Sequence, residues 1–160
     1  MALDNYNDLR DYNRDTIVAL NTDLTDFVYG DIKRLQEANA NLDTGAKIMF
    51  MEFPSINPRD RDGSVDVKYS TGISILSNPN SELMDDQDTA MAENMEIARE
   101  ILLRYRRDQP LLGHHFTIND VQKIDPVRLY TGAGWIGCRF EVDLGDWMGT
   151  ALNAAKWTDI

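Results

Sequence analysis

The strongest constraint on the fold is a strict alternation of apolar and polar residues in two separate segments of the chain. In residues 65–75 the apolar or β-branched side chains occupy every second position, namely Val65, Val67, Tyr69, Thr71, Ile73 and Ile75. Residues 135–144 repeat this pattern with Ile136, Cys138, Phe140, Val142 and Leu144. Successive side chains of a strand point to opposite faces of a sheet, so a period of two indicates a strand with one face toward the core. Both segments are therefore predicted to be strands of a largely antiparallel sheet.

The first of these strands is expected to pair with the segment before it as a hairpin. Residues 47–53 also alternate, and both of their faces are apolar enough to be covered. Pro54 and Pro58 should end this segment and leave residues 55–64 as a long loop. The loop carries alternating charges at Arg59, Asp60, Arg61 and Asp62, followed by Gly63. The first hairpin is therefore predicted to have a long charged tip.

The second hairpin is expected in the last third of the chain. Residues 116–130 contain regularly placed apolar side chains, with a bulge or bend expected near Pro126. A turn at residues 131–134 should then lead into the strand of residues 135–144.

Two longer segments have the three- and four-residue spacing of a helix. Residues 86–107 place Met91, Met95, Ala98, Leu102 and Tyr105 on one stripe. Aspartates stand in the first turn and arginines in the last, the order that the helix dipole favours, and Pro110 and Gly113 should end the helix. A second helix is predicted from Ile17 to Leu35, with residues 22–25 and Gly30 as possible breaks.

Together these elements predict a single α+β domain, with two helices packed on a mostly antiparallel sheet in the order helix, hairpin, helix, hairpin. The 160 residues suffice for one core, expected over residues 16–144. Residues 1–15, with Leu3, Tyr6, Leu9 and Tyr12 spaced by three, should form a short amphipathic helix or an arm. Residues 145–160 should form a tail that carries Trp147 and Trp157.

The charge of the chain limits its partners. With 16 Lys and Arg against 27 Asp and Glu, the net charge is −11, which disfavours non-specific binding to nucleic acid or to anionic lipid. No apolar run approaches the length of a membrane span, and the single Cys138 excludes an intrachain disulfide. We therefore expect neither a membrane nor a nucleic-acid surface as a specific partner.

Two groups of residues resemble known cofactor or metal motifs, and each lacks something that its chemistry requires. Gly132, Gly134 and Gly137 have the spacing of a dinucleotide fingerprint, but a strand pattern follows them instead of a helix. Residues 58–69 have the glycine of a calcium loop, but Pro58 and Tyr69 stand where the loop needs acids.

A nucleophile or metal site built from histidine and cysteine is also disfavoured. His114 and His115 are adjacent, so on a strand they would face opposite sides, and Cys138 lies on an apolar face where an inert thiol is expected. We expect no catalytic residue, no cofactor and no metal.

One basic cluster stands at the end of the long helix. Arg104, Arg106 and Arg107 complement the negative end of the helix dipole. They could also dock an acidic neighbour, such as the aspartate-rich N-terminal segment of another copy.

The element order over residues 16–144 resembles the tail-terminator and neck proteins of long-tailed bacteriophages. The resemblance also rests on the charged tip from Arg59 to Gly63 and on a closing hairpin from Ile124 to Phe140. It implies a structural virion protein that is assembled in the cytoplasm of a bacterial host. It further implies a homo-oligomeric ring, commonly a hexamer, that contacts other tail or neck proteins and lets DNA pass through its lumen without specific binding.

Two other functions remain open from the sequence. The first alternative is a small, non-catalytic α+β ligand-binding or sensory domain whose sheet face holds an apolar molecule. The second is an enzyme built around His114 or His115. For the ring, the residues expected at the subunit interface are Arg59, Asp60, Arg61, Asp62, Arg106, Arg107, Trp147 and Trp157.

Overall fold

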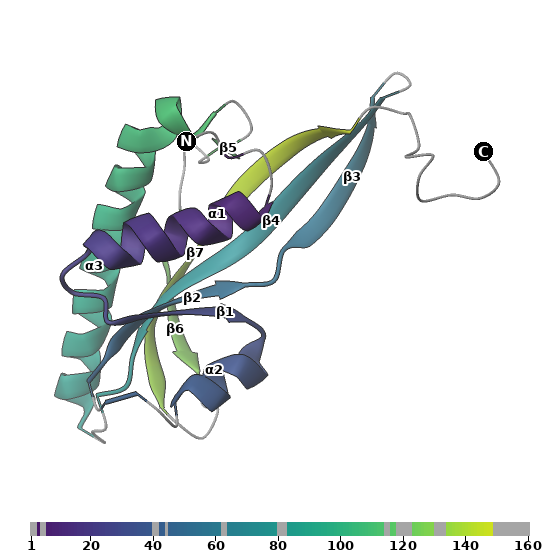
Figure 1. Cartoon of the computed structure of the whole chain (residues 1–160). Coiled ribbons are helices and arrows are strands. Elements are labelled where there is room, and N and C mark those ends of the chain that lie inside the picture. The colour runs from purple at the N-terminus through teal and green to yellow at the C-terminus, as the bar shows by residue number, and fades with distance from the viewer. Residues whose placement is uncertain are drawn as a thin grey trace.

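The α+β fold class is confirmed by the structure, a computed structural model in which helices pack on a mostly antiparallel sheet (Figure 1). It describes residues 3, 6–39, 42–43, 45–61, 64–79, 83–113, 116–117, 123–129 and 134–148. Within these ranges, only the backbone is described for residues 39, 58–61, 64–67, 117, 129 and 146–148. No helix in the described ranges is long and apolar enough to cross a membrane.

Seven strands form one twisted sheet. They are β1 (Asp26–Gly30), β2 (Lys47–Glu52), β3 (Ser55–Arg61), β4 (Ser64–Ser77), β5 (Phe116–Thr117), β6 (Asp125–Leu129) and β7 (Trp135–Met148). The order across the sheet is β1-β2-β4-β7-β5, with β3 also paired to β4 and β6 also paired to β7. Only β1 and β2 are parallel, and every other pair is antiparallel. The two 14-residue strands β4 and β7 form the centre, as their alternation predicts.

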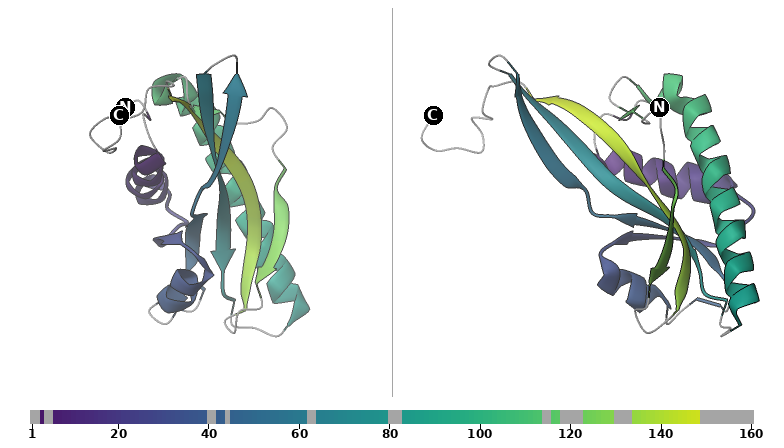
Figure 2. Two further views of the ribbon diagram at one scale, coloured as in Figure 1. Left: turned by 90° about the vertical axis from the view of Figure 1, so that its right-hand side faces the viewer. Right: turned by 180° about the vertical axis from the view of Figure 1, so that it is seen from behind.

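Helices cover both faces of this sheet. They are α1 (Tyr6–Tyr12), which continues into the π-helical segment η1 (Asn13–Val18), α2 (Ile32–Asn39) and α3 (Met84–Leu112). The first and last of these pack on one face of the sheet, and α2 packs on the other (Figures 1 and 2). Strand β2 therefore divides its side chains: Met49 and Met51 join the core under α1 and α3, whereas Ile48 and Phe50 join the core under α2. The expectation that this strand is covered on both faces is confirmed.

The single helix expected over residues 17–35 is wrong, because the segment divides into η1, β1 and α2. A turn separates η1 from β1, and the backbone N–H of Asp23 bonds to the side chain of Asn21 at 2.9 Å. Phe27 and Tyr29 pack against the core on one side of the sheet and Val28 on the other, as in a strand. Both possible breaks named from the sequence are real, but the strand between them was missed.

The long charged loop expected at residues 55–64 is also wrong. Residues 55–61 form β3, which pairs with β4 from Ser55↔Ser70 to Arg61↔Ser64. Only residues 62 and 63 stand between the two strands, and they lie outside the described residues. Pro58 did not end the strand, because β3 pairs only with β4 and proline is tolerated in an edge strand.

The two terminal segments belong to the fold more than expected. Leu3, Leu9 and Tyr12 are buried in the core, and the backbone N–H of Leu3 bonds to the carbonyl of Leu112 at 2.8 Å. Of the two expectations for this segment, the described residues 3 and 6–15 therefore fit the short amphipathic helix, which packs on the core, and not a separate arm. At the other end, β7 continues past Leu144 to Met148, so the first residues of the expected tail are strand.

The most distinctive feature of the shape is a ribbon that projects from the body (Figures 1 and 2). We define this β-arm as residues 57–61 of β3, 64–68 of β4 and 145–148 of β7. The pairing of β2 with β4 ends at Met51↔Ile73, and that of β5 with β7 ends at Phe116↔Leu144. Beyond these points the described part of the sheet consists of β3, β4 and β7.

Candidate functional site

The β-arm brings together two parts of the predicted interface that are far apart in the sequence. The register pairs Arg59 with Asp66 across β3 and β4, and Asp66 with Trp147 across β4 and β7. Arg59 and Trp147 therefore share one row across the arm, and Asp60 and Arg61 follow on β3 toward its end. The sequence placed these residues in a loop and in a tail, with nothing to show that they are neighbours.

The remaining predicted interface residues are not in this row. Asp62 and Trp157 lie outside the described residues. Arg106 and Arg107 are exposed near the end of α3, away from the arm (Figure 1). The Nε of Arg107 donates to Asp108 of the same helix at 3.0 Å. The structure therefore places the arginine cluster in a different region from the charged tip.

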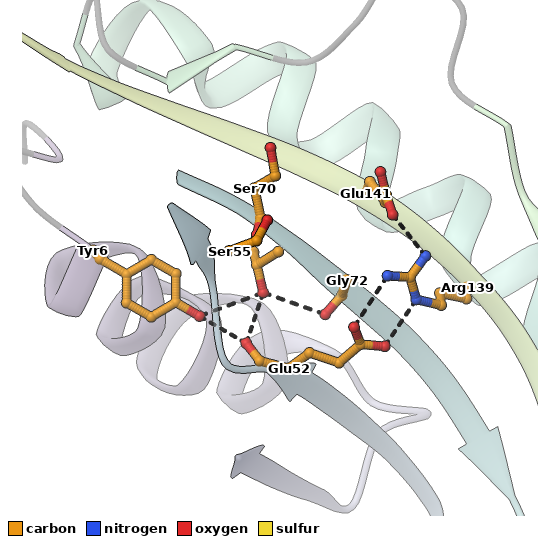
Figure 3. A network of polar contacts seen from close by, with 8 residues as sticks. Tyr6, Glu52, Ser55, Ser70, Gly72, Arg139 and Glu141 are labelled. Atoms are coloured by element: carbon orange, nitrogen blue, oxygen red, sulfur yellow. Dashed lines mark hydrogen bonds and ion pairs between the residues drawn. The ribbon is translucent and has the colours of Figure 1, made fainter. Parts of the chain in front are cut away.

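An ion-pair network at the base of the arm was missed by the sequence reasoning (Figure 3). The guanidinium of Arg139 on β7 donates to both carboxylate oxygens of Glu52 on β2, at 2.8 and 3.0 Å, and to Glu141 at 2.9 Å. The hydrogen bond to Glu52 is the main reason why the pKa of Arg139 is raised, so this guanidinium stays charged. Gly72 of β4 leaves room for the bridge, because a Cβ there would lie 2.4 Å from Nη2 of Arg139.

A second polar group continues the network toward the arm. The Nζ of Lys68 lies 2.7 Å from the buried carboxylate of Asp143, and the Ser70 hydroxyl donates to the same carboxylate at 2.7 Å. Residues 68 and 70 of β4 and residues 139, 141 and 143 of β7 share one face of the sheet by their alternation. This face is opposite α1 and α3, so a charged surface continues from the body onto the arm.

The other side of the same junction is fixed by hydroxyl groups (Figure 3). The hydroxyls of Tyr6 and Thr71 both donate to the carbonyl oxygen of Glu52, at 2.8 and 2.7 Å. This carbonyl stands just before the chain passes from β2 to β3, so the two bonds hold the point where the arm leaves the body. Burial raises the pKa of Tyr6 above its usual value, which keeps the hydroxyl available as a donor.

Cys138 and Gly134, two of the residues considered for catalysis or cofactor binding, are described, and both have a structural role. Cys138 is fully buried, and its thiol donates to the backbone oxygen of Asn94 at 3.3 Å. Burial raises the pKa of this thiol to about 12, which fits the inert cysteine expected from the sequence. Gly134 leads into β7 instead of a helix, so the glycine motif lacks the helix that holds a pyrophosphate. His114 and His115 lie outside the described residues.

The described part of the chain holds no group of three or more histidine, cysteine or acidic residues placed to bind a metal.

A depression of about 300 Å³ lies where β2 and β4 meet the start of α3. Its lining includes Lys47, whose Nζ lies 2.7 Å from Glu93, and Ser77.

Comparison of the sequence with known protein families and with curated protein sequences gives no match.

Proposed function

We propose that this protein is a structural ring subunit of a long-tailed bacteriophage, located at the tail end or at the head–tail junction of the virion. In this role it assembles in the cytoplasm of the bacterial host with copies of itself, most simply six, and with other tail or neck proteins. The observation that carries the proposal is the β-arm, a three-stranded ribbon that extends from a compact α+β body (Figure 1).

A ribbon of this kind is suited to contact with another protein chain. Two- and three-stranded ribbons gain stability when a face packs against another layer, and the described helices lie on the body. The arm also carries Arg59, Asp60 and Arg61 on one strand and Trp147 on another. Tryptophan and arginine are enriched among residues that contribute most to binding, and alternating charges set register between partners.

The base of the arm suits a contact of defined geometry. Arg139 ties β7 to Glu52 of β2, and Lys68 ties β4 to Asp143 of β7. These pairs join the strands at the point where the arm leaves the body, so the arm projects at a fixed angle. A fixed projecting element that contacts a different surface of the next copy forms a heterologous interface, which closes into a ring when the rotation between copies permits.

The overall charge also fits a ring with DNA in its lumen. A net charge of −11 repels DNA, so the nucleic acid can pass without adhering to the wall. The alternative of an apolar ligand held on an open sheet face fits less well. Within the body, the apolar rows of β2, β4 and β7 lie under helices, whereas the sheet face opposite α1 and α3 carries Glu52 and Arg139 near the arm.

A shortened arm tests the proposal. The register pairs Asn57 with Lys68, so a two-residue Asn-Gly turn can replace residues 58–67 without changing the pairing at the base. We expect this variant to melt as cooperatively as the full chain but to lose the ring, measured by light scattering coupled to size-exclusion chromatography. The matched control is Lys33→Glu, a change at an exposed position of α2 outside the arm, which leaves the arm intact and should keep the ring. A shortened variant that assembles like the full chain contradicts the proposal.

A further inference from the structure

An aromatic surface with an arginine lies at the bend between β2 and β3. We define this elbow patch as Tyr29, Arg34, Phe53 and Ile56. The rings of Tyr29 and Phe53 meet edge to face with their centroids 5.0 Å apart, and the guanidinium of Arg34 lies 5.6 Å from the centre of the Phe53 ring. Phe53 is 48% exposed and Ile56, three residues further along the bend, is 60% exposed, so the bend presents large apolar side chains to solvent.

The charge of Arg34 is not matched within the described chain. Its Nη1 donates to the backbone oxygen of Tyr29 at 3.3 Å, and no carboxylate among the described residues forms an ion pair with it. Elsewhere in the same residues, arginines such as Arg99, Arg128 and Arg139 have acidic partners. A stacked arginine with a free charge, beside exposed aromatic and aliphatic groups, has the composition of an interface centre.

A complementary surface occurs at the start of α3. Leu83 and Met84 are exposed, Met84 at 59%, and Asp85 follows them in the first turn. Asp85 is exposed and forms no ion pair with a described residue. The first turn of α3 thus offers what the elbow patch lacks, namely apolar side chains next to a carboxylate. The bend between β2 and β3 and the first turn of α3 lie on different sides of the body (Figures 1 and 2).

We propose that the elbow patch of one copy binds the first turn of α3 of the next copy, with Met84 against Phe53 and Ile56 and with Asp85 paired to Arg34. This inference rests on the proposed ring, and it names the contact by which the ring closes. Because the two surfaces lie on different sides of the body, one copy cannot bring its own pair together, and a contact between them on neighbouring copies is heterologous. The contact is continuous with the base of the β-arm, so one interface extends from the elbow along the arm.

Cysteine cross-linking tests the geometry directly. We expect the double variant Ile56→Cys, Met84→Cys to form a ladder of covalent oligomers on mild oxidation. A mixture of the two single variants should give covalent dimers, and each single variant alone should give none. The native Cys138 does not interfere, because it is buried. The pair Leu20→Cys, Met84→Cys is the control, since Leu20 is equally exposed but belongs to neither surface. Single variants that cross-link with themselves, or a double variant that gives no ladder, overturn the proposal.

Charge reversal tests the ion pair and separates this inference from the ring itself. Arg34→Glu and Asp85→Arg should each raise the concentration needed for assembly by roughly tenfold or more, and the combined variant should recover most of the loss. Lys33→Glu, an equal charge change at an exposed neighbouring position, should have little effect. If the wild type forms rings that neither Arg34→Glu nor Asp85→Arg weakens, the elbow contact is wrong and the ring remains. If the wild type assembles neither alone nor on addition of tail tubes, both proposals fall.

Discussion

A single buried carboxylate helps to hold the first residues of the chain on the core. Asp108 of α3, whose side chain is 10% exposed, accepts hydrogen bonds from the Tyr12 hydroxyl at 2.8 Å and from Arg107 at 3.0 Å, and it also pairs with Arg104. Burial alone would raise the pKa of this carboxyl, but the bonds from Arg104, Tyr12 and Arg107 outweigh it and lower the pKa to about 2. Tyr105 adds a hydrogen bond to Asn13, so polar contacts fix α1 and η1 on α3.

This junction predicts how Asp108→Asn changes stability. At pH 7 the variant should lose about 1–3 kcal/mol of unfolding free energy, because charged hydrogen bonds in a buried site are replaced by weaker ones. The pKa of Asp108 is lower in the folded than in the unfolded state, so its stabilisation is full above about pH 4 and is lost as the pH falls toward about 2. Urea unfolding at several pH values measures the difference from wild type, which should shrink over that range.

The control for this change is Asp23→Asn, an aspartate exposed in the turn before β1. Its substitution should leave the unfolding free energy almost unchanged at every pH. An Asp108→Asn variant as stable as wild type at pH 7 would show that the carboxylate does not fix the helices.

At the scale of the elements, the sequence predicts those whose pattern is long enough to decide locally. The alternation in β4 and β7 and the stripe in α3 each extend over many residues, and the structure confirms all three. β1 was missed because it has five residues and is held by pairing with β2, which lies beyond α2. β3 was missed because Pro58 reads as a strand breaker unless the strand is known to be at an edge, and edge position depends on distant pairing. Pro110 was likewise expected to end its element, but α3 continues past it to Leu112.

The strand arrangement also explains one glycine of the apparent dinucleotide motif. Gly137 lies opposite Leu76, and a Cβ at Gly137 would stand 1.8 Å from the backbone oxygen of Ile75. At Gly72 an added Cβ would meet only the ends of the Arg139 and Glu52 side chains, which can move. We therefore expect Gly137→Ala to cost about 3 kcal/mol of unfolding free energy and Gly72→Ala about 1 kcal/mol. Chemical denaturation of both variants measures the two losses of unfolding free energy. Equal losses would contradict this account of the two positions.

At the scale of the whole molecule, the sequence identified residues of the candidate site but not their arrangement. Arg59 and Trp147 were singled out from charge and from side-chain type, yet their common row depends on two strand pairings that no local pattern contains. The network of Glu52, Arg139 and Glu141 was missed for the same reason. The sequence shows only that these strands carry opposite charges at their polar positions. That signal can be used only once the strands are known to lie close together.

The most direct test of the central claim is the size and symmetry of the 160-residue chain in solution, by native mass spectrometry and electron microscopy on the same sample. The account predicts a closed ring with a central opening and a mass six times that of the 18.2 kDa chain, formed alone or on addition of tail tubes. A chain that stays monomeric or dimeric at high concentration, and that also fails to bind tail tubes, would contradict it.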